Sequence, residues 1–131
     1  MDKKITRFNQ RKESFERTLK LLLRQSKKEV VSDENIGATL HFFEMSFELA
    51  WKVLKDLLEV NGIIAKSPRD TIKNAFQQEY ISDGHVWLQM LDARNSIAHA
   101  YEEAMAHKLF TQIRHTYLDY LKEIEALECT D

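Results

Sequence analysis

The chain has 131 residues, enough for one domain with its own core, and its 44% hydrophobic and 31% charged residues are typical of a globular protein in water. Only three Gly and one Pro are present, so turns are scarce and a few long helices are favoured over a many-stranded sheet. No apolar run approaches the roughly 20 residues of a membrane span, and the basic N-terminus lacks the apolar core of a signal peptide. The single cysteine, Cys129, cannot form a disulfide within the chain, so we expect a protein of the reducing cytoplasm.

The net charge of −2 is unevenly distributed along the chain. Residues 1–28 hold ten of the 19 Lys and Arg and three acids, which gives this segment +7 and the remainder −9. An imbalance of this kind indicates either a polyanionic or acidic partner or simply a solvated helix face.

The first predicted helix runs from about Lys4 to Ser26. Apolar side chains recur in it at helical spacing and form one stripe, which consists of Ile5, Phe8, Phe15, Leu19 and Leu22. On the opposite side we expect a basic band, which consists of Arg7, Arg17, Arg24 and Lys28.

The second predicted helix opens at Ser32 and continues through Val60 to the stop signal Asn61-Gly62. One apolar stripe of this helix consists of Ile36, Leu40, Phe43, Phe47, Trp51, Leu54 and Leu58, and a second consists of Phe42, Met45, Leu49 and Val53. A helix that is apolar on two sides has packing partners on two sides, so we place it at the centre of a bundle or in a dimer interface.

His41, Glu44 and Glu48 are neighbours on this helix, a grouping that raises the question of a metal. The chain lacks the paired Glu-x-x-His motifs of di-metal bundles, so we predict no metal site and no cofactor.

The third predicted helix is short, with Ser67 as its cap, Pro68 at its first position and an end near Tyr80. Ser82-Asp83-Gly84 then turns the chain into a fourth helix, buried by Val86, Trp87, Met90, Leu91 and Ile97. A last amphipathic helix begins between residues 101 and 104 and continues to the C-terminus. We therefore predict an all-α fold, an antiparallel up-and-down bundle of four long helices plus one short helix, in a single domain 1–131.

The segment Leu91-Asp-Ala-Arg-Asn-Ser-Ile-Ala-His-Ala-Tyr101 concentrates polar side chains at the end of the fourth helix. Asn95 and His99 share a helical face, and Arg94 and Tyr101 return to nearly one face if the helix continues. Arg is a fixed cation with a planar fork for phosphate, and His exchanges a proton near neutral pH, so the segment indicates phosphate chemistry. The alternative is structural: Arg94 pairs with Asp92 or another acid, and His99 and Tyr101 are buried and hydrogen-bonded.

Two stretches carry a resemblance to a known family: Ser67-Pro68-Arg69, and Trp87-Leu88-x-Met90-Leu91-x-x-Arg94-Asn95-x-x-x-His99-x-Tyr101. They resemble the signature of the HEPN-fold proteins known as nucleotidyltransferase substrate-binding proteins, and the resemblance covers most of the chain. Small departures are Ala98 and Ala100 beside the His, where small polar residues are common, and Glu102 after the Tyr, where Asn or Asp is frequent.

The resemblance implies a HEPN-like helical bundle, a homodimer and a partner, a minimal nucleotidyltransferase encoded nearby. It implies either a toxin-type, metal-independent ribonuclease whose antitoxin nucleotidyltransferase attaches AMP to Tyr101, or a non-catalytic subunit that binds a nucleotide or another substrate. A structural interaction module without a nucleotide or RNA role is the third reading.

For the ribonuclease, a two-fold dimer supplies two copies of the motif. We expect one His99 to act as base and the other as acid, Arg94 to steady the phosphate, and Asn95 to orient the His or the substrate. The basic band of the first helix is then the expected RNA-binding surface, with salt-sensitive affinity.

Overall fold

The structure, a computed structural model, describes residues 2–29 and 31–129. The described chain folds into helices whose bounds are α1 (Lys3–Ser26), α2 (Asp33–Val60), α3 (Pro68–Gln77), α4 (Gly84–Ser96), the 3-10 turn η1 (Ile97–His99), α5 (Glu103–Gln112), the π-helical turn η2 (Ile113–Tyr117), α6 (Leu118–Leu121) and the 3-10 segment η3 (Lys122–Ala126). The all-α bundle predicted from the sequence is confirmed. No helix among the described residues combines the length and apolar character needed to cross a membrane.

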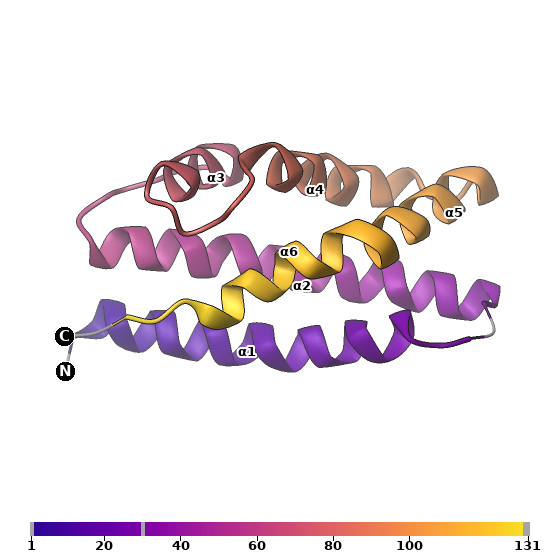
Figure 1. The fold of residues 1–131 in the computed structure, drawn as a ribbon, viewed down its shortest axis with the longest axis horizontal. Coiled ribbons are helices and arrows are strands. Elements are labelled where there is room, and N and C mark those ends of the chain that lie inside the picture. The colour runs from indigo at the N-terminus through magenta and orange to yellow at the C-terminus, as the bar shows by residue number, and fades with distance from the viewer. Residues whose placement is uncertain (1, 30, 130–131) are drawn as a thin grey trace.

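Helices α1 and α2 lie side by side and antiparallel, and α3 and α4 lie on the other side of α2 (Figure 1). The C-terminal run from α5 to η3 crosses the bundle obliquely and contacts both α1 and α2. The α1–α2 and α4–α5 connections are at the same end of the molecule, on the right in Figure 1, so the polar segment that ends at Tyr101 lies near the start of α2.

Local sequence explains where the first two helices begin. The Asp2 side chain accepts a hydrogen bond from the backbone N–H of Lys4 at 2.8 Å, and that of Ser32 accepts one from Asn35 at 3.1 Å, so both helix starts have capped amides. The Asn35 side chain is buried and donates to the carbonyl oxygen of Gln25 at 2.9 Å. This bond joins the end of α1 to the start of α2.

The predicted stripes form the core. All five apolar residues of the α1 stripe are buried, and so are all residues of the first α2 stripe except Trp51, which is half-buried. The second α2 stripe divides: Val53 is buried, Phe42 and Leu49 are half-buried, and 39% of Met45 is exposed. Helix α2 is therefore central to the bundle, with an apolar edge left partly open to solvent.

Helices α2 and α3 both end in a Schellman motif, in which a residue with left-handed backbone reverses the chain. In α2 this residue is Gly62, with φ of 81°. In α3 it is Glu79, with φ of 64°, and the N–H of Tyr80 donates to the carbonyl of Ala75 at 2.9 Å. Because the reversal takes place at Glu79, α3 ends at Gln77, slightly before the predicted end near Tyr80.

The last helix is not the continuous helix that the sequence predicts. A π-helical turn at Ile113–Tyr117 interrupts it, and its final residues tighten into a 3-10 segment. A π turn accommodates one extra residue, and the turn here begins and ends at buried side chains, Ile113 and Tyr117.

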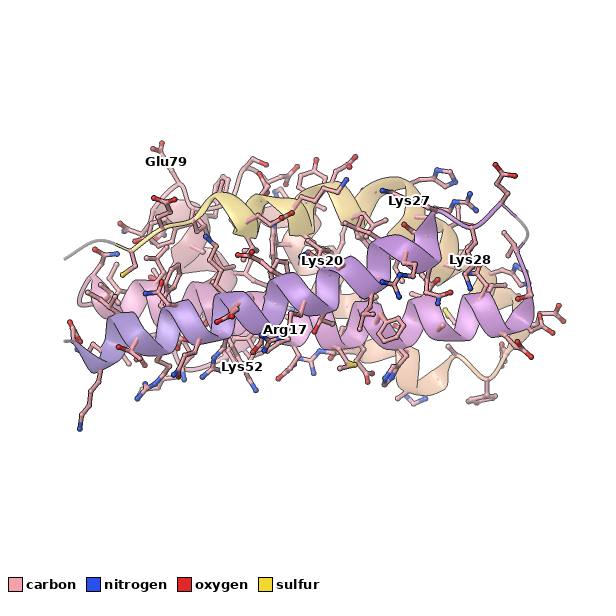
Figure 2. All side chains as sticks on the ribbon, turned by 90° about the horizontal axis from the view of Figure 1, so that it is seen from below. Arg17, Lys20, Lys27, Lys28, Lys52 and Glu79 are labelled. Carbon is pink, nitrogen blue, oxygen red and sulfur yellow. The ribbon has the colours of Figure 1, made fainter. Side chains whose placement is uncertain are left out.

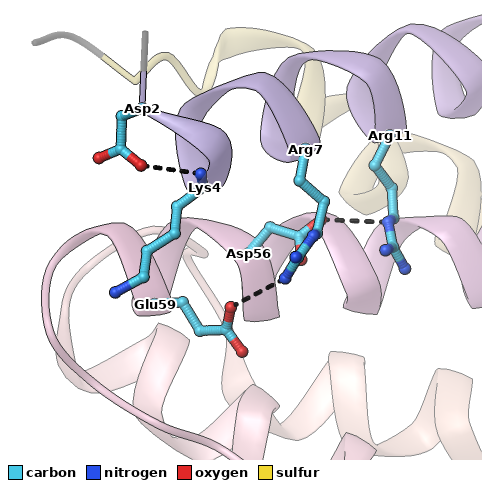
Figure 3. A network of polar contacts seen from close by, with 6 residues as sticks. All are labelled: Asp2, Lys4, Arg7, Arg11, Asp56 and Glu59. Atoms are coloured by element: carbon cyan, nitrogen blue, oxygen red, sulfur yellow. Dashed lines mark hydrogen bonds and ion pairs between the residues drawn. The ribbon is translucent and has the colours of Figure 1, made fainter.

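Ion pairs join α1 to α2 near the N-terminus (Figure 3). The Arg11 Nε lies 3.1 Å from Oδ2 of the buried Asp56, and the Arg7 Nη1 lies 3.5 Å from Oε2 of Glu59. Burial raises the pKa of the Asp56 carboxyl, and the charges of Arg11 and then Arg7 act in the opposite direction. These two arginines therefore hold two helices together.

Candidate functional site

Arg94 is held against α2 by two contacts. Its Nη1 lies 3.6 Å from Oε2 of Glu48, and its guanidinium carbon lies 6.0 Å from the centroid of the Phe47 ring. Phe47 is fully buried and packs in turn on Trp87 of α4, with ring centroids 6.1 Å apart. The guanidinium is thus held in place by the aromatic ring of Phe47 and by the carboxylate of Glu48.

The sequence left open whether Arg94 forms an ion pair with Asp92 or with another acidic residue. In the structure its partner is another acid, Glu48. Asp92 points to a different helix and pairs with Arg69 of α3, at 3.7 Å between Oδ1 and Nη2. The Arg94 Nε is buried and has no hydrogen-bond partner within the described part of the chain. This Nε–H is shielded from solvent and substrate, so any phosphate must be met by the exposed part of the guanidinium, since 26% of the side chain is exposed.

Helix α4 ends at Ser96, before it reaches His99. The chain tightens into the 3-10 turn η1, and the N–H of Ala100 donates to the carbonyl of Ile97 at 3.0 Å. The return of Arg94 and Tyr101 to one helical face was expected only if the helix continued, and this condition is not met. The same applies to the shared α-helical face expected for Asn95 and His99, because a 3-10 turn advances by about 120° per residue.

Asn95, His99 and Tyr101 are all exposed. Tyr101 is 83% exposed, and none of the three side chains forms a hydrogen bond or ion pair with the residues that the structure describes. The buried, hydrogen-bonded roles considered for His99 and Tyr101 are therefore wrong. Both groups are presented to solvent on a short segment between two helices.

Two shallow grooves flank this segment. The first runs between the start of α2 and the start of α5, where Ala100 and Tyr101 face Ile36 and Leu40. The second lies beside Arg94 and is lined by Glu44, Met45 and Glu48 of α2, so it adjoins the open apolar edge of that helix.

Only part of the predicted basic band of α1 is free of ion pairs with the described residues. Arg7 pairs with Glu59, and the Arg17 Nη1 lies 3.6 Å from Oε1 of Glu13. Arg24 and Lys28 are exposed and form no ion pair with the described residues, and the same holds for Lys20 and Lys27 nearby. Figure 2 shows Lys20, Lys27 and Lys28 toward the C-terminal end of α1. Within the described residues, the unpaired members of the predicted band, Arg24 and Lys28, therefore lie at the end of the bundle that carries the motif, while the exposed Lys3 and Lys4, also without an ion pair, lie at the other end of α1.

Sequence reasoning missed the role of Glu48, which it grouped with His41 and Glu44 as a conceivable metal set. Glu48 instead lies between two cations, Arg94 and Lys52, at 3.6 and 3.4 Å. Nothing local in the sequence connects residues 48 and 94, because their contact depends on how α4 crosses α2.

Comparison with known proteins adds to this geometry. Residues 3–127 match the family described as nucleotidyltransferase substrate binding protein like. The chain belongs to this family. A curated relative, a probable ribonuclease HepT from Haemophilus influenzae, is 28% identical over 89 residues, which are 64% of this chain and 61% of the relative. The match thus spans about three fifths of the relative's length.

A crystal structure of a protein from Thermus thermophilus has the same fold, with a TM-score of 0.79 and 27% sequence identity. The superposition covers 85% of this chain and 95% of that one. The HEPN-type assignment made from the stretches Ser67–Arg69 and Trp87–Tyr101 is therefore confirmed.

Proposed function

We propose that this HEPN-type protein is a metal-independent ribonuclease of the toxin type, which acts as a homodimer. The observation that carries the proposal is the state of the motif: Arg94 is held on α2 with 26% of its side chain exposed, while His99 stands exposed just beyond the end of α4. A fixed cation and an accessible imidazole are the groups that phosphodiester cleavage without a metal requires. The name of the Haemophilus influenzae relative supports the same reaction class.

The proposed reaction is attack by the RNA 2′-oxygen on the adjacent phosphorus. The bond from the 2′-oxygen to phosphorus forms as the bond to the leaving 5′-oxygen breaks. His99 of one protomer takes the 2′-hydroxyl proton, and His99 of the second protomer gives a proton to the leaving oxygen. Arg94 neutralises the charge that builds on the non-bridging oxygens, and Asn95 positions the substrate.

One chain offers one motif His, so the mechanism needs a dimer in which two motifs meet. The open apolar edge of α2 (Phe42, Met45 and Leu49) supports such an interface, because the groove beside Arg94 includes Met45. We expect Met45→Glu to produce a monomer in light scattering and to lose cleavage. Ile64→Glu is the matched control, since Ile64 is also exposed but lies in the α2–α3 connection. A wild-type monomer at micromolar concentration contradicts the paired-His mechanism.

The unpaired cations at the end of α1 support an RNA path toward the motif. We expect the double variant Arg24→Glu with Lys28→Glu to weaken RNA binding and to reduce its salt dependence, by a slope of about 0.7 for each lost phosphate contact on a single strand. Arg17→Glu should do less, because Arg17 already pairs with Glu13. Equal effects of the two sets contradict this path.

We further propose that a partner nucleotidyltransferase silences the protein by attaching AMP to Tyr101. The phenol oxygen attacks the α-phosphorus of ATP, pyrophosphate leaves, and the phenol proton passes to solvent or to a base of the partner. The 83% exposure of Tyr101 supports access for a second protein. Intact-mass analysis after incubation with the nucleotidyltransferase encoded nearby and ATP should show one adduct per chain. Tyr101→Phe should abolish it, whereas Tyr120→Phe should not.

The second candidate function is a non-catalytic subunit that binds a nucleotide or another substrate. The description of the family favours it, as does the pairing of Arg94 with Glu48, which already occupies part of the guanidinium. On this reading, Arg94 and His99 bind the substrate phosphate and cleave nothing.

One assay separates the two. Purified protein, without a partner and with a chelator present, is incubated with total cellular RNA. The ribonuclease predicts cleavage that is lost in His99→Ala and Arg94→Ala, poorly restored by Arg94→Lys, and retained in His115→Ala, since His115 is exposed outside the motif. Absence of cleavage by the unmodified wild type, with nucleotide binding that depends on His99, favours the binding subunit.

A further inference from the structure

Three potential metal ligands converge at the end of the bundle that carries Tyr101. Asp33 is the first residue of α2, Glu103 is the first residue of α5, and His107 lies one helical turn after Glu103. Each offers one ligand atom, and these atoms all lie within 4.8 Å of one another. Across residues 2–29 and 31–129, no other set of three His, Cys, Asp or Glu side chains meets this criterion.

The position of each carboxylate at a helix N-terminus is explained by the helix dipole, but the closeness of the two carboxylates is not. Asp33 and Glu103 stand in the first turns of α2 and α5, where the helix dipole favours a negative charge. Two carboxylates this close nevertheless repel each other, and the fold brings them together from helices about 70 residues apart in sequence. The His107 Nε2 lies 3.8 Å from Oε1 of Glu103, so an imidazole nitrogen adjoins the pair of carboxylates.

A divalent cation resolves this arrangement, because it offsets both carboxylates at once and accepts a lone pair from the imidazole. We propose that Asp33, Glu103 and His107 bind a first-row divalent transition-metal ion of the Zn²⁺ type.

The donor set indicates the class of ion. Mg²⁺ and Ca²⁺ prefer sites made of oxygen ligands alone, whereas an imidazole with two carboxylates suits Zn²⁺, Co²⁺ or Ni²⁺. All three side chains are exposed, so water completes the coordination, as in other zinc sites with three protein ligands.

The ion would fasten the start of α5 to the start of α2. Asp33, Glu103 and His107 line the groove that also contains Tyr101, so the metal would hold one side of that groove in place. The start of α5 lacks a side-chain cap, because Glu102 at its N-cap position forms no capping hydrogen bond, so the ion would add to the packing of Met105 and Ala106 against the core. The site is structural and independent of the proposed ribonuclease, in which the metal takes no part.

The test is calorimetric titration of Zn²⁺ into chelator-treated protein that carries no histidine tag. We expect about one ion per chain, with affinity reduced at least about tenfold in His107→Ala and in Asp33→Asn, and unchanged in the presence of excess Mg²⁺. His85→Ala is the matched control, since His85 is exposed at the far end of α4. Co²⁺ bound in the same way should give visible absorption bands that weaken in His107→Ala.

Two further measurements keep the result unambiguous. Circular dichroism verifies that the variants are folded, which their exposed positions predict, and Glu103→Gln offers a third variant of nearly unchanged volume. Zn²⁺ should raise the melting temperature of the wild type and leave that of His107→Ala unmoved. Absence of Zn²⁺ binding by the folded wild type overturns the site, as does binding that is equal in wild type, His107→Ala and Asp33→Asn. Neither outcome bears on RNA cleavage, which is measured with a chelator present.

Discussion

Replacement of Arg11 by Met tests the account of how α1 is attached to α2. The Asp56 side chain is 5% exposed and that of Arg11 is 28% exposed, with 3.1 Å between Oδ2 and Nε. Removing the cation leaves a buried carboxylate, and breaking a buried pair from one side costs about 3–5 kcal/mol. Arg7 also acts on Asp56, and Arg11 is partly in water, so we expect Arg11→Met to lose about 2–3 kcal/mol of unfolding free energy at neutral pH.

The loss of unfolding free energy should differ according to which partner of the Arg11–Asp56 pair is replaced. Asp56→Asn removes the charge that burial disfavours and leaves an arginine that can reach water, so we expect a loss of about 1 kcal/mol. The double variant should resemble Asp56→Asn, because Arg11→Met has little further to remove once the carboxylate is gone. Arg17→Met is the control: the pair of Arg17 with Glu13 is exposed on both sides, and its loss should change stability by less than about 0.5 kcal/mol.

The pH dependence provides a second, signed test. The folded pKa of Asp56 lies above its ordinary value of 3.8, so the folded state holds this proton more tightly than the unfolded chain does. The contribution of this carboxyl to stability is therefore largest below pH 3.8 and is lost as pH rises through the raised folded value. Removing Arg11 raises that value further, so the penalty of Arg11→Met should shrink as the pH is lowered toward about 4.

Urea denaturation of the four proteins (wild type, the two single variants and the double variant) at several pH values measures these quantities. The difference in unfolding free energy between Arg11→Met and the double variant, followed against pH, separates the contribution of Asp56 from those of the other groups that titrate in this range. A loss below about 1 kcal/mol at neutral pH, or one that stays constant as the pH falls, refutes the picture of a carboxylate that burial disfavours and Arg11 compensates.

The remaining predictions concern backbone reversals and the support of Arg94, and urea denaturation measures each of them. Gly62→Ala should destabilise the protein by about 1 kcal/mol and Glu79→Gly should stabilise it by about 0.5–1 kcal/mol, because both positions have left-handed backbone. Changes in stability of the same sign for the two variants contradict this. Gly37→Ala should stabilise by about 0.5–1 kcal/mol, since Gly37 is an exposed position inside α2 with open space where the methyl group would lie; a loss would show a contact not accounted for. Phe47→Leu should cost about 1–2 kcal/mol and also slow RNA cleavage, because it removes the ring beneath Arg94, and unchanged cleavage would mean that the ring does not position the guanidinium.

Apolar periodicity predicted most of the fold. The stripe from Ile5 to Leu22 identified the buried face of α1, and the signals at Ser32, Asn61 and Ser67 set helix bounds that the structure reproduces within about one residue. These signals are local, because a cap or a stripe depends only on neighbours within one or two turns.

The departures have non-local causes. The π-helical turn at Ile113–Tyr117 depends on how two parts of one helix fit the same core, which no window of the sequence reports. The end of α4 at Ser96 is similar: Ile97 to Ala100 carries no Gly, Pro or Asn to announce a stop, and tertiary packing turns the chain there.

For the candidate site, residue types were predictable and their partners were not. The side chains of Arg94 and His99 suggested phosphate chemistry by themselves, and the family resemblance named Tyr101. The contact of Arg94 with Glu48, and the meeting of Asp33 with residues of α5, depend on helices that are distant in sequence, so no spacing rule finds them.

The exposure of the segment from Asn95 to Tyr101 has an evolutionary consequence. The side chains of Asn95, His99 and Tyr101 bury little surface and form no hydrogen bond or ion pair with the described residues, so exchanging them changes chemistry at almost no cost in folding free energy. Selection for a new partner or substrate, or for loss of activity, can then act on this segment while the core is inherited unchanged. Arg94 is the exception, because its contacts with α2 tie one functional group to the scaffold, and drift at Glu48 or Phe47 would alter the site from a distance.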